Sequence, residues 1–255
     1  LWGVFMKIIS FNIRCSNDEN GNSIAERAVR LKKILANYRP DVIGFQEATP
    51  VWMPLLENDY AADYEIFYHY RDTTGWVETP PILWKRDCFN CLDSGYFWLS
   101  DTPHIPSKGW DETGYNRICL WVKLQERATG KVFYHFNTHF GFGEACQAKS
   151  AELLANTAAA LGGGTTVVTG DFNLHPTDSA YKTLTAYFTD VNAVTANDWQ
   201  TTFHNYGKIT AGEHIDYCFL KSGELAPLNS KIIRDTVNGQ FPSDHYGLLS
   251  EFSWR

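Results

Sequence analysis

The stretch Gly162-Gly-Gly-Thr-Thr-Val-Val-Thr-Gly-Asp-Phe-Asn-Leu-His-Pro176 carries the clearest signal of the fold in this sequence. A glycine turn leads into the β-branched run 165–169, which stops at Gly170-Asp171-Phe172-Asn173. This pattern predicts a short buried strand that ends in a carboxylate and an amide, with Pro176 preventing its continuation. An ionised carboxylate at the edge of an apolar core is costly unless a cation or hydrogen bonds compensate it. In an α/β chain, such a strand end is a usual place for chemistry.

The composition is that of an ordinary globular protein with a sizeable core. The 255 residues are 44% hydrophobic and 20% charged. The net charge of −7 disfavours tight binding to long nucleic acid, but it leaves short or single-stranded nucleic acid open as a partner. An acidic balance also suits a site rich in metal-binding carboxylates. Because no repeat, low-complexity tract or linker divides the sequence, we expect a single domain over residues 1–255 and a monomer.

Cysteine usage and apolar runs bear on location and redox chemistry. The six cysteines of so long a chain do not form a small disulfide scaffold, and Cys88-Phe-Asn-Cys91 is a lone CxxC motif that favours ordinary strand or loop cysteines over zinc. No apolar run is long enough to span a membrane. The first residues, Leu1-Trp2-Gly3, are compatible with signal-peptide removal, so both a cytoplasmic and an exported protein stay open.

The opening of the chain is predicted to be strand, helix, strand. Residues 7–13 form an apolar run, and Ser23 with Glu26 forms a capping box that begins a helix ending before Pro40. Residues 41–47 are then a second strand, which ends in a carboxylate. We expect a solvated helix face, rather than a phosphate-binding stripe, at Arg27, Arg30, Lys32 and Lys33.

The rest of the chain is richer in strands than in helices. Expected strands cover 64–70, 82–85, 88–99, 118–125, 132–138, 215–220, 231–236 and 248–252, and expected helices cover 144–161 and 177–187. Residues 100–116 contain two prolines and two glycines and predict a long surface loop. Its Trp110 and Tyr115 form either an aromatic shelf beside a site or simple loop packing.

Polar and acidic residues recur at the ends of the predicted strands. They are Asn12, Glu47, His139, Asp171, Asn173, Asp216, Asp244 and His245. A single one would be an ordinary cap or turn, but the repetition indicates a site. Oxygen ligands without a Cys/His cluster favour Mg²⁺ or Mn²⁺. Such an ion suits phosphoryl chemistry, in which the metal neutralises phosphate charge, a carboxylate and an amide orient water, and a histidine stabilises or protonates the developing charge.

These motifs occur in an order that resembles a known family. The blocks are Ser10-Phe11-Asn12-Ile13, Gln46-Glu47, Asn137-Thr138-His139, Gly170-Asp171-Phe172-Asn173, Ile215-Asp216-Tyr217 and Ser243-Asp244-His245. Over residues 7–252 they resemble the endonuclease/exonuclease/phosphatase superfamily, which has the DNase I-like fold. Residues 97–103 and Arg117-Ile118 resemble its bacterial branch near nocturnin-type deadenylases and sphingomyelinase-like phosphodiesterases. The resemblance implies an α/β fold in which two mixed β-sheets pack as a sandwich, with helices on both outer faces and a site at one edge.

The resemblance implies roles for the metal and for the attacking water. Glu47 would be the main Mg²⁺ or Mn²⁺ ligand, with Asn12 beside it. Asp171 and Asn173 would position the water and the scissile phosphate. His245 would act there as an acid/base or as an electrostatic stabiliser.

It also implies a set of supporting residues. Either Asp216 or Asp244 would orient the catalytic histidine. His139 would bind a non-bridging phosphate oxygen with Glu78 as its partner, and Arg117 would contact substrate phosphate.

One segment departs from the family pattern. After Asn137-Thr138-His139-Phe140, relatives of this branch tend to continue with Asp-His, whereas this chain has a shortened segment, residues 141–147. The segment borders the expected cleft, so the departure affects substrate recognition rather than metal binding. The resemblance implies hydrolysis of a phosphodiester by in-line attack of water, with a sugar or inositol phosphomonoester and a non-catalytic binding module as alternatives. A metal-free esterase is disfavoured because the sequence has no nucleophile elbow.

Overall fold

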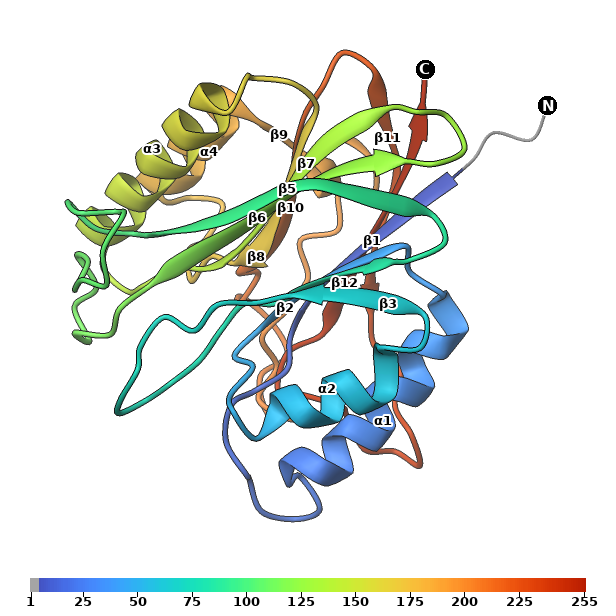
Figure 1. Cartoon of the computed structure of the whole chain (residues 1–255). Helices are drawn as coiled ribbons and strands as arrows, with labels where there is room; N and C mark the ends of the chain where they lie inside the picture. Colours follow the sequence, from blue (N-terminus) through green and yellow to red (C-terminus); the bar gives the residue numbers. More distant parts are fainter. Residues whose placement is uncertain (1–4) are drawn as a thin grey trace.

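Two six-stranded mixed β-sheets pack face to face, and helices cover both outer faces (Figure 1). The computed structural model describes residues 5–255, so the Leu1-Trp2-Gly3 start lies outside the described residues. The predicted α/β sandwich is therefore confirmed. Among residues 5–255, no helix combines the length and the apolar character needed to cross a membrane.

The first sheet is built around a central parallel pair. Its strands, in spatial order, are β11 (Leu225–Ile233), β12 (Gly247–Trp254), β1 (Phe5–Asn12), β2 (Val42–Gln46), β4 (Ile82–Lys85) and β3 (Tyr64–Phe67). β1 and β2 run parallel, and the other neighbouring pairs are antiparallel. Helices α1 (Ile24–Tyr38) and α2 (Trp52–Tyr60) pack on the outer face of this sheet.

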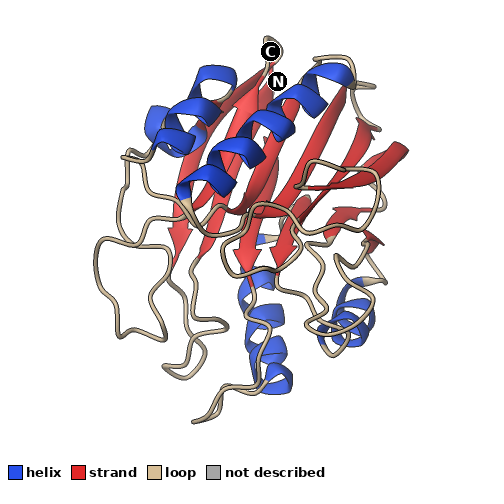
Figure 2. Ribbon diagram, turned by 90° about the vertical axis from the view of Figure 1, so that its left-hand side faces the viewer, coloured by secondary structure: helices blue, strands red, loops and turns tan. Residues whose placement is uncertain are grey.

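The second sheet repeats this plan. Its strands, in spatial order, are β5 (Phe89–Trp98), β6 (Ile118–Glu126), β7 (Val132–His139), β8 (Thr166–Asp171), β10 (Asp216–Lys221) and β9 (Thr189–Asp190). Only β7 and β8 run parallel. Helices α3 (Glu144–Ala160) and α4 (Ser179–Tyr187) lie across the outer face (Figure 2), and the short α5 (Val191–Val194) follows β9.

Three apolar layers hold the sandwich together. Between the sheets, Ile8 of the first sheet belongs to the same buried cluster as Val122 and Val167 of the second. A second cluster joins the first sheet to α1 and α2, and a third joins the second sheet to α3 and α4. Each sheet buries both faces, which explains why β2 and β8 are buried along their entire length.

Helix α1 confirms the predicted capping box, and Lys32 and Lys33 are exposed as expected, but the solvated face is corrected for Arg27 and Arg30. Ser23 N donates to Glu26 Oε2 (3.1 Å), and Ser23 Oγ accepts from Glu26 N (3.4 Å). Arg27 is 0% exposed and Arg30 is 5% exposed, so neither lies on a solvated face. The guanidinium of Arg27 instead donates to the backbone carbonyls of residues 13, 14, 16 and 22 and lies over the ring of Trp52.

Four elements differ from the sequence prediction: α2, β9 and α5 were not predicted, and β11 begins earlier than expected. Helix α2 was not predicted because it is short and contains Pro54, but a proline in the first turn removes only an N–H that has no partner within the helix. Strand β11 begins at Leu225, six residues before the predicted start at residue 231. A register shift between Pro227 and Asn229 interrupts its alternation and hides the strand from pattern analysis.

Candidate active site

The site forms where the ends of β1, β2, β7 and β8 meet at one edge of the sandwich. Asn12, the last residue of β1, donates from Nδ2 to Glu47 Oε1 and to Asp171 Oδ2, both at 2.9 Å. The backbone N–H of Cys15 donates to the other oxygen of Glu47 (2.7 Å). One amide therefore joins a carboxylate of the first sheet to a carboxylate of the second, which confirms that the predicted strand-end residues converge.

Three residues at this edge adopt the left-handed backbone conformation that favours glycine. Arg14, Glu47 and Asn173 have φ values of 62°, 65° and 51°. Such conformations of non-glycine residues are uncommon and persist only where the surroundings enforce them, often at functional sites. The turn after each strand thus directs Glu47 and Asn173 toward the same space.

Asn173 is held in place beside Asp171. Its backbone N–H donates to Asp171 Oδ1 (3.0 Å), and its side-chain Nδ2 donates to the carbonyl of Phe140 (2.9 Å). Gln147 of α3 donates from Nε2 to the carbonyl of Asn173. Gln147 belongs to the shortened segment that sequence analysis associated only with substrate recognition, so its contact with a site residue was missed.

His245 is oriented by Asp216 rather than by Asp244. Nδ1 of His245 lies 2.9 Å from Asp216 Oδ2, and its Nε2 faces Asp171 Oδ2 at 3.7 Å. Asp244 instead accepts from Ser243 Oγ (3.2 Å) and lies 3.6 Å from Nε of Arg14. The geometry thereby decides between the two alternatives that the resemblance left open.

His139 approaches the same carboxylate from the second sheet. Its Nε2 lies 3.6 Å from Asp171 Oδ2, while Nδ1 is buried and has no hydrogen-bond partner in the described part of the chain. The hydrogen bond and the close ion pair of Glu78 go to Trp76 and Arg71, the latter at 3.0 Å. The expected pairing of Glu78 with His139 is therefore corrected: Glu78 is the partner of Arg71.

Burial and neighbouring charges shift the pKa values of the histidines in opposite directions. Burial opposes the charged form of His245, but Asp216, Asp171 and Asp244 outweigh it and raise its pKa to about 10. Burial and the nearby Arg117 lower the pKa of His139 well below its usual value. The site thus holds one imidazolium and one neutral imidazole at neutral pH.

The pKa values of the two central carboxylates, Asp171 and Glu47, also shift in opposite directions. Burial and the charge of Asp216 raise the pKa of Asp171 to about 7. Burial opposes the ionised form of Glu47 as well, but the neighbouring His139 and the donors from Cys15 and Asn12 favour it, and its pKa falls to about 2. Glu47 is therefore a half-buried carboxylate, immediately after β2, that stays ionised at neutral pH.

The donor set fits a hard divalent cation. Ionised Glu47 provides an oxygen within 4.8 Å of a carboxylate oxygen of Glu78 and of Cys15 Sγ, and Asp171, Asp216 and His245 form a second close group. Two buried carboxylates this close favour a cation between or beside them. Asn12 now directs Nδ2 at the carboxylates and accepts from Arg14 N (3.0 Å) through Oδ1, so ligation through Oδ1 requires its amide to turn over.

The site opens into a cleft of about 390 Å³. Half-exposed rings of Trp76, Tyr115 and Phe142 line it together with buried Arg71 and Arg117. Arg117 is held by Asp111 at 2.6 Å, and the ring of Tyr115 lies 5.1 Å from the guanidinium of Arg71.

The loop aromatics thus have different surroundings. Tyr115 belongs to the cleft wall, as the shelf interpretation predicts. Trp110 instead contacts Lys149 of α3 and donates to Asp101 (3.2 Å), which is loop packing. Arg14, Arg71, Trp76 and Phe142 are cleft residues that sequence analysis did not select, because no strand-end pattern marks them.

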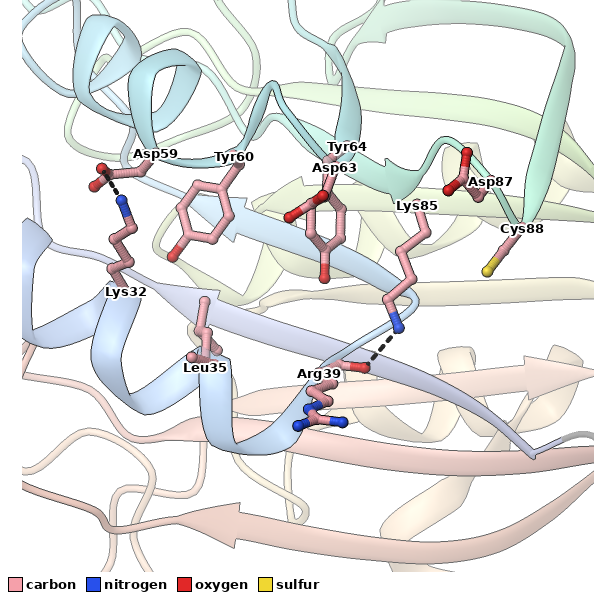
Figure 3. A pocket seen from close by; sticks show the side chains of 11 residues that line it. Lys32, Leu35, Arg39, Asp59, Tyr60, Asp63, Tyr64, Lys85, Asp87 and Cys88 are labelled. Atoms are coloured by element: carbon pink, nitrogen blue, oxygen red, sulfur yellow. Dashed lines mark hydrogen bonds and ion pairs between the residues drawn. The ribbon is translucent and has the colours of Figure 1, made fainter.

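A larger groove of about 550 Å³ lies between α1 and the segment from α2 to β4 (Figure 3). Its two lysines already have partners: Lys32 pairs with Asp59, and Lys85 pairs with Asp41, each at 2.8 Å. Lys85 also donates to the carbonyl of Arg39 (3.0 Å), as Figure 3 shows. None of the predicted site residues lines this groove, so volume alone would have selected the wrong cavity.

Comparison with known proteins places the chain in a family. The model of the endonuclease/exonuclease/phosphatase family matches residues 9–245. Protein L388 of Acanthamoeba polyphaga mimivirus is 30% identical over 240 residues, covering 84% of this chain and 87% of the viral protein.

Two solved structures from Bacteroides thetaiotaomicron superpose closely. An endonuclease/exonuclease/phosphatase family protein gives a TM-score of 0.90 at 25% identity, with both chains covered completely. The mannosyl-6-phosphatase Bt3783 gives 0.87 at 26% identity, covering 97% of this chain and 99% of that one. These likenesses support a hydrolase of phosphate esters. The chain belongs to the endonuclease/exonuclease/phosphatase family.

Proposed function

We propose that this protein hydrolyses a phosphate ester by in-line attack of water, with a bound Mg²⁺ or Mn²⁺. The observation that carries the proposal is the convergence on Asp171, whose carboxylate is bound by Asn12 and lies within 4 Å of Nε2 of both His139 and His245. Glu47 stands on the other side of the same amide. Carboxylate, amide and imidazole groups so arranged support phosphoryl transfer to water.

The cation would be held by Glu47, with Asn12 as a further ligand after its amide turns over. When bound, it supplies neutralisation of phosphate charge and polarises the phosphorus–oxygen bonds. Glu78 lies close to Glu47 but is neutralised by Arg71, so its first role is to hold that arginine in the cleft wall.

The protein's own side chains account for the orientation of the water and for the stabilisation of developing charge. Asp171 accepts a hydrogen bond from the attacking water, and Asn173 holds Asp171 in place through its backbone N–H. His245, charged and oriented by Asp216, stabilises negative charge that develops on the phosphate oxygens. His139, a neutral imidazole, donates a hydrogen bond to a non-bridging oxygen.

The cleft favours a small substrate, and a sugar phosphomonoester fits it best. Its 390 Å³ lies within the range of small-molecule sites, about 300–1,000 Å³. Aromatic walls suit the apolar face of a sugar ring, and Glu213 on the lining accepts hydrogen bonds from hydroxyl groups while repelling a second phosphate. The similarity to a mannosyl-6-phosphatase adds weight to this class.

A phosphodiester, which the sequence resemblance implied as the first choice of substrate, becomes the second candidate here. Three arginines, Arg14, Arg71 and Arg117, line the cleft, and each also pairs with a carboxylate. Their guanidinium groups would offer hydrogen-bond donors to a diester with a compact second substituent.

A hydrolysis panel distinguishes the candidates. Mannose 6-phosphate, an aryl phosphomonoester, an aryl phosphodiester, single-stranded RNA, duplex DNA and a phosphocholine lipid would each be tested with Mg²⁺, with Asp171→Asn as the matched control. We expect hydrolysis of the sugar phosphate, lost in the variant. Hydrolysis of a diester alone would select the second candidate, and Mg²⁺ binding without hydrolysis of any compound would favour a binding module.

Metal removal tests the proposed cofactor separately. We expect EDTA to abolish turnover by the wild-type protein and added Mg²⁺ or Mn²⁺ to restore it, because Glu47 then regains its cation. Initial rates before and after chelation measure this. Full activity in EDTA would contradict the metal-dependent mechanism.

A further inference from the structure

A buried polar cluster lies between the two sheets, directly beneath the site. Its members come from β1 and β2 of the first sheet and from β7 and β8 of the second, and none is more than 1% exposed. They are Ser10, Gln46, His135, Asn137 and Thr169. Apolar side chains such as Ile8, Val122 and Val167 fill much of the remaining space between the sheets.

Hydrogen bonds of the cluster cross from one sheet to the other. Gln46 Nε2 donates to Asn137 Oδ1 (2.8 Å) and to Ser10 Oγ (3.2 Å). Asn137 Nδ2 donates back to the carbonyl of Phe45 in β2 (2.7 Å). Thr169 Oγ1 donates to Asn137 Oδ1 (3.0 Å) and lies 2.8 Å from Nε2 of His135. Asn137 thus ties β2 to β7 and β8 through both ends of its amide.

The sheets approach unusually closely at this point, and Gly44 permits it. A Cβ atom on Gly44 would lie 2.5 Å from Asn137 Oδ1 and 2.5 Å from Thr169 Oγ1. Stacked sheets are ordinarily about 10 Å apart, a distance filled by side chains from both. Here the backbone of β2 contacts the side chains of the opposite sheet directly.

Each strand that contributes to the cluster also contributes a site residue. Ser10, Asn137 and Thr169 stand two positions before Asn12, His139 and Asp171, respectively. Because side chains two apart in a strand point to the same face, each pair projects into the same space, one layer apart. Gln46 immediately precedes Glu47.

The cluster does not maximise stability. Within residues 5–255, Gln46 Oε1 and His135 Nδ1 are buried without a hydrogen-bond partner. An incompletely satisfied polar cluster is generally less stable than apolar packing of the same volume, but its directional bonds hold one arrangement. The cluster is therefore better explained by the arrangement of the two sheets that it fixes than by a gain in stability.

We propose that Gln46, Asn137 and Thr169 are positioning residues that set the separation of Glu47 on the first sheet from Asp171 on the second. This inference rests on the proposed phosphoesterase function. In the part of the chain that the structure describes, Asn12 is the one residue that donates a hydrogen bond to both carboxylates. The cluster one layer below holds the sheets at the spacing that lets Asn12 contact both.

Matched substitutions in β8 test the proposal. Thr169→Val removes the hydroxyl at nearly constant volume, Thr169→Ser retains it, and Thr166→Val makes the same change at an equally buried position at the start of the strand. We expect Thr169→Val to lower kcat about 10- to 100-fold with KM changed less than about threefold, since misplacement near 1 Å has effects of this order. Thr169→Ser and Thr166→Val should stay within about twofold of the wild type.

Gln46→Met provides an independent variant, and two readouts do not depend on turnover. Calorimetric titration with Mg²⁺ should show weaker binding by Thr169→Val and Gln46→Met than by Thr166→Val. Crystal structures of the first two should show that Asn12 no longer contacts both Glu47 and Asp171. If the carboxylates keep their positions, or if Thr166→Val loses as much activity, the proposal is wrong. If the wild-type protein hydrolyses none of the compounds but the variants show these structural shifts, the proposed function is contradicted and the positioning role is still supported.

Discussion

Asp171 is the residue at which stability and activity conflict most directly. It is 2% exposed, and burial with the charge of Asp216 raises its pKa to about 7. We expect Asp171→Asn to lower kcat by about 10³-fold or more, because the water loses its acceptor. The free energy of unfolding without metal should stay equal or rise by about 1–2 kcal/mol at pH 8, since a buried charge is removed.

The pH dependence of the stability gained by Asp171→Asn follows from the raised pKa of Asp171. The native state retains a proton on Asp171 that the unfolded state releases, so the wild-type protein loses stability as the pH rises from about 4 to about 7. The advantage of Asp171→Asn should therefore be larger at pH 8 than at pH 5. Urea unfolding at both pH values measures it, and a loss of several kcal/mol in the variant would show that Asp171 is structural.

His245 provides a second test at this scale, because its two acidic neighbours have different contacts. Asp216 lies 2.9 Å from Nδ1, whereas Asp244 pairs with Arg14. We expect Asp216→Asn to lower kcat about 10²- to 10⁴-fold and to move the pKa of His245 down from about 10. Asp244→Asn should move it much less. Titration of the His245 ring by NMR measures the shift, and equal shifts in both variants would contradict the assignment.

At the scale of elements, Arg27 connects α1 to the loop that carries Arg14 and Cys15. Its guanidinium donates to the carbonyls of Asn22, Ile13, Arg14 and Ser16. We expect Arg27→Met to cost about 2–4 kcal/mol of unfolding free energy, because several buried carbonyls lose their partner. Chemical denaturation measures this.

The matched control is Lys33→Met on the exposed side of the same helix, which should stay within about 0.5 kcal/mol of the wild type. The loop also presents Cys15 N to Glu47, so Arg27→Met should weaken Mg²⁺ binding as well. If the two variants had equal stability, the anchoring role of Arg27 would be wrong.

The elements that could be predicted are those whose signals are local. Helix α1 has a capping box and an apolar stripe, and β8 has a β-branched run between glycines, so both follow from neighbouring residues. Helix α2 has nine residues and a weak pattern, and it forms because Trp52 and Leu56 pack under the first sheet. A short helix stabilised by tertiary packing gives little signal in its own sequence.

At the scale of the whole molecule, the interface between the sheets contains a titratable group. His135 is 0% exposed, and burial lowers its pKa to about 3. The unfolded state takes up a proton near pH 6.5 that the native state refuses, so stability is complete above that pH and falls as the pH drops toward 3.

Between pH 6 and pH 4, we expect His135 to lower the free energy of unfolding by up to about 1.4 kcal/mol for each pH unit. His135→Leu should therefore show a shallower loss of unfolding free energy over this range than the wild type. Denaturant unfolding at a series of pH values measures both slopes. Parallel slopes would mean that His135 is accommodated as a charged group.

The sequence by itself determined the α/β class, the strand ends that bear Asn12, Glu47 and Asp171, and the oxygen-rich side chains at those ends, which would suit a hard cation. These properties depend on residue type and on alternation over a few positions, which neighbouring residues control. Tertiary structure alone decided that Asp216 contacts His245, that Arg27 is buried and that Glu78 forms an ion pair with Arg71. Those outcomes depend on pairs far apart in the chain, such as Asn12 and Asp171, which are separated by 159 residues. Only the packing of one sheet on the other brings such pairs together, and no local pattern records which partner a buried charge will meet.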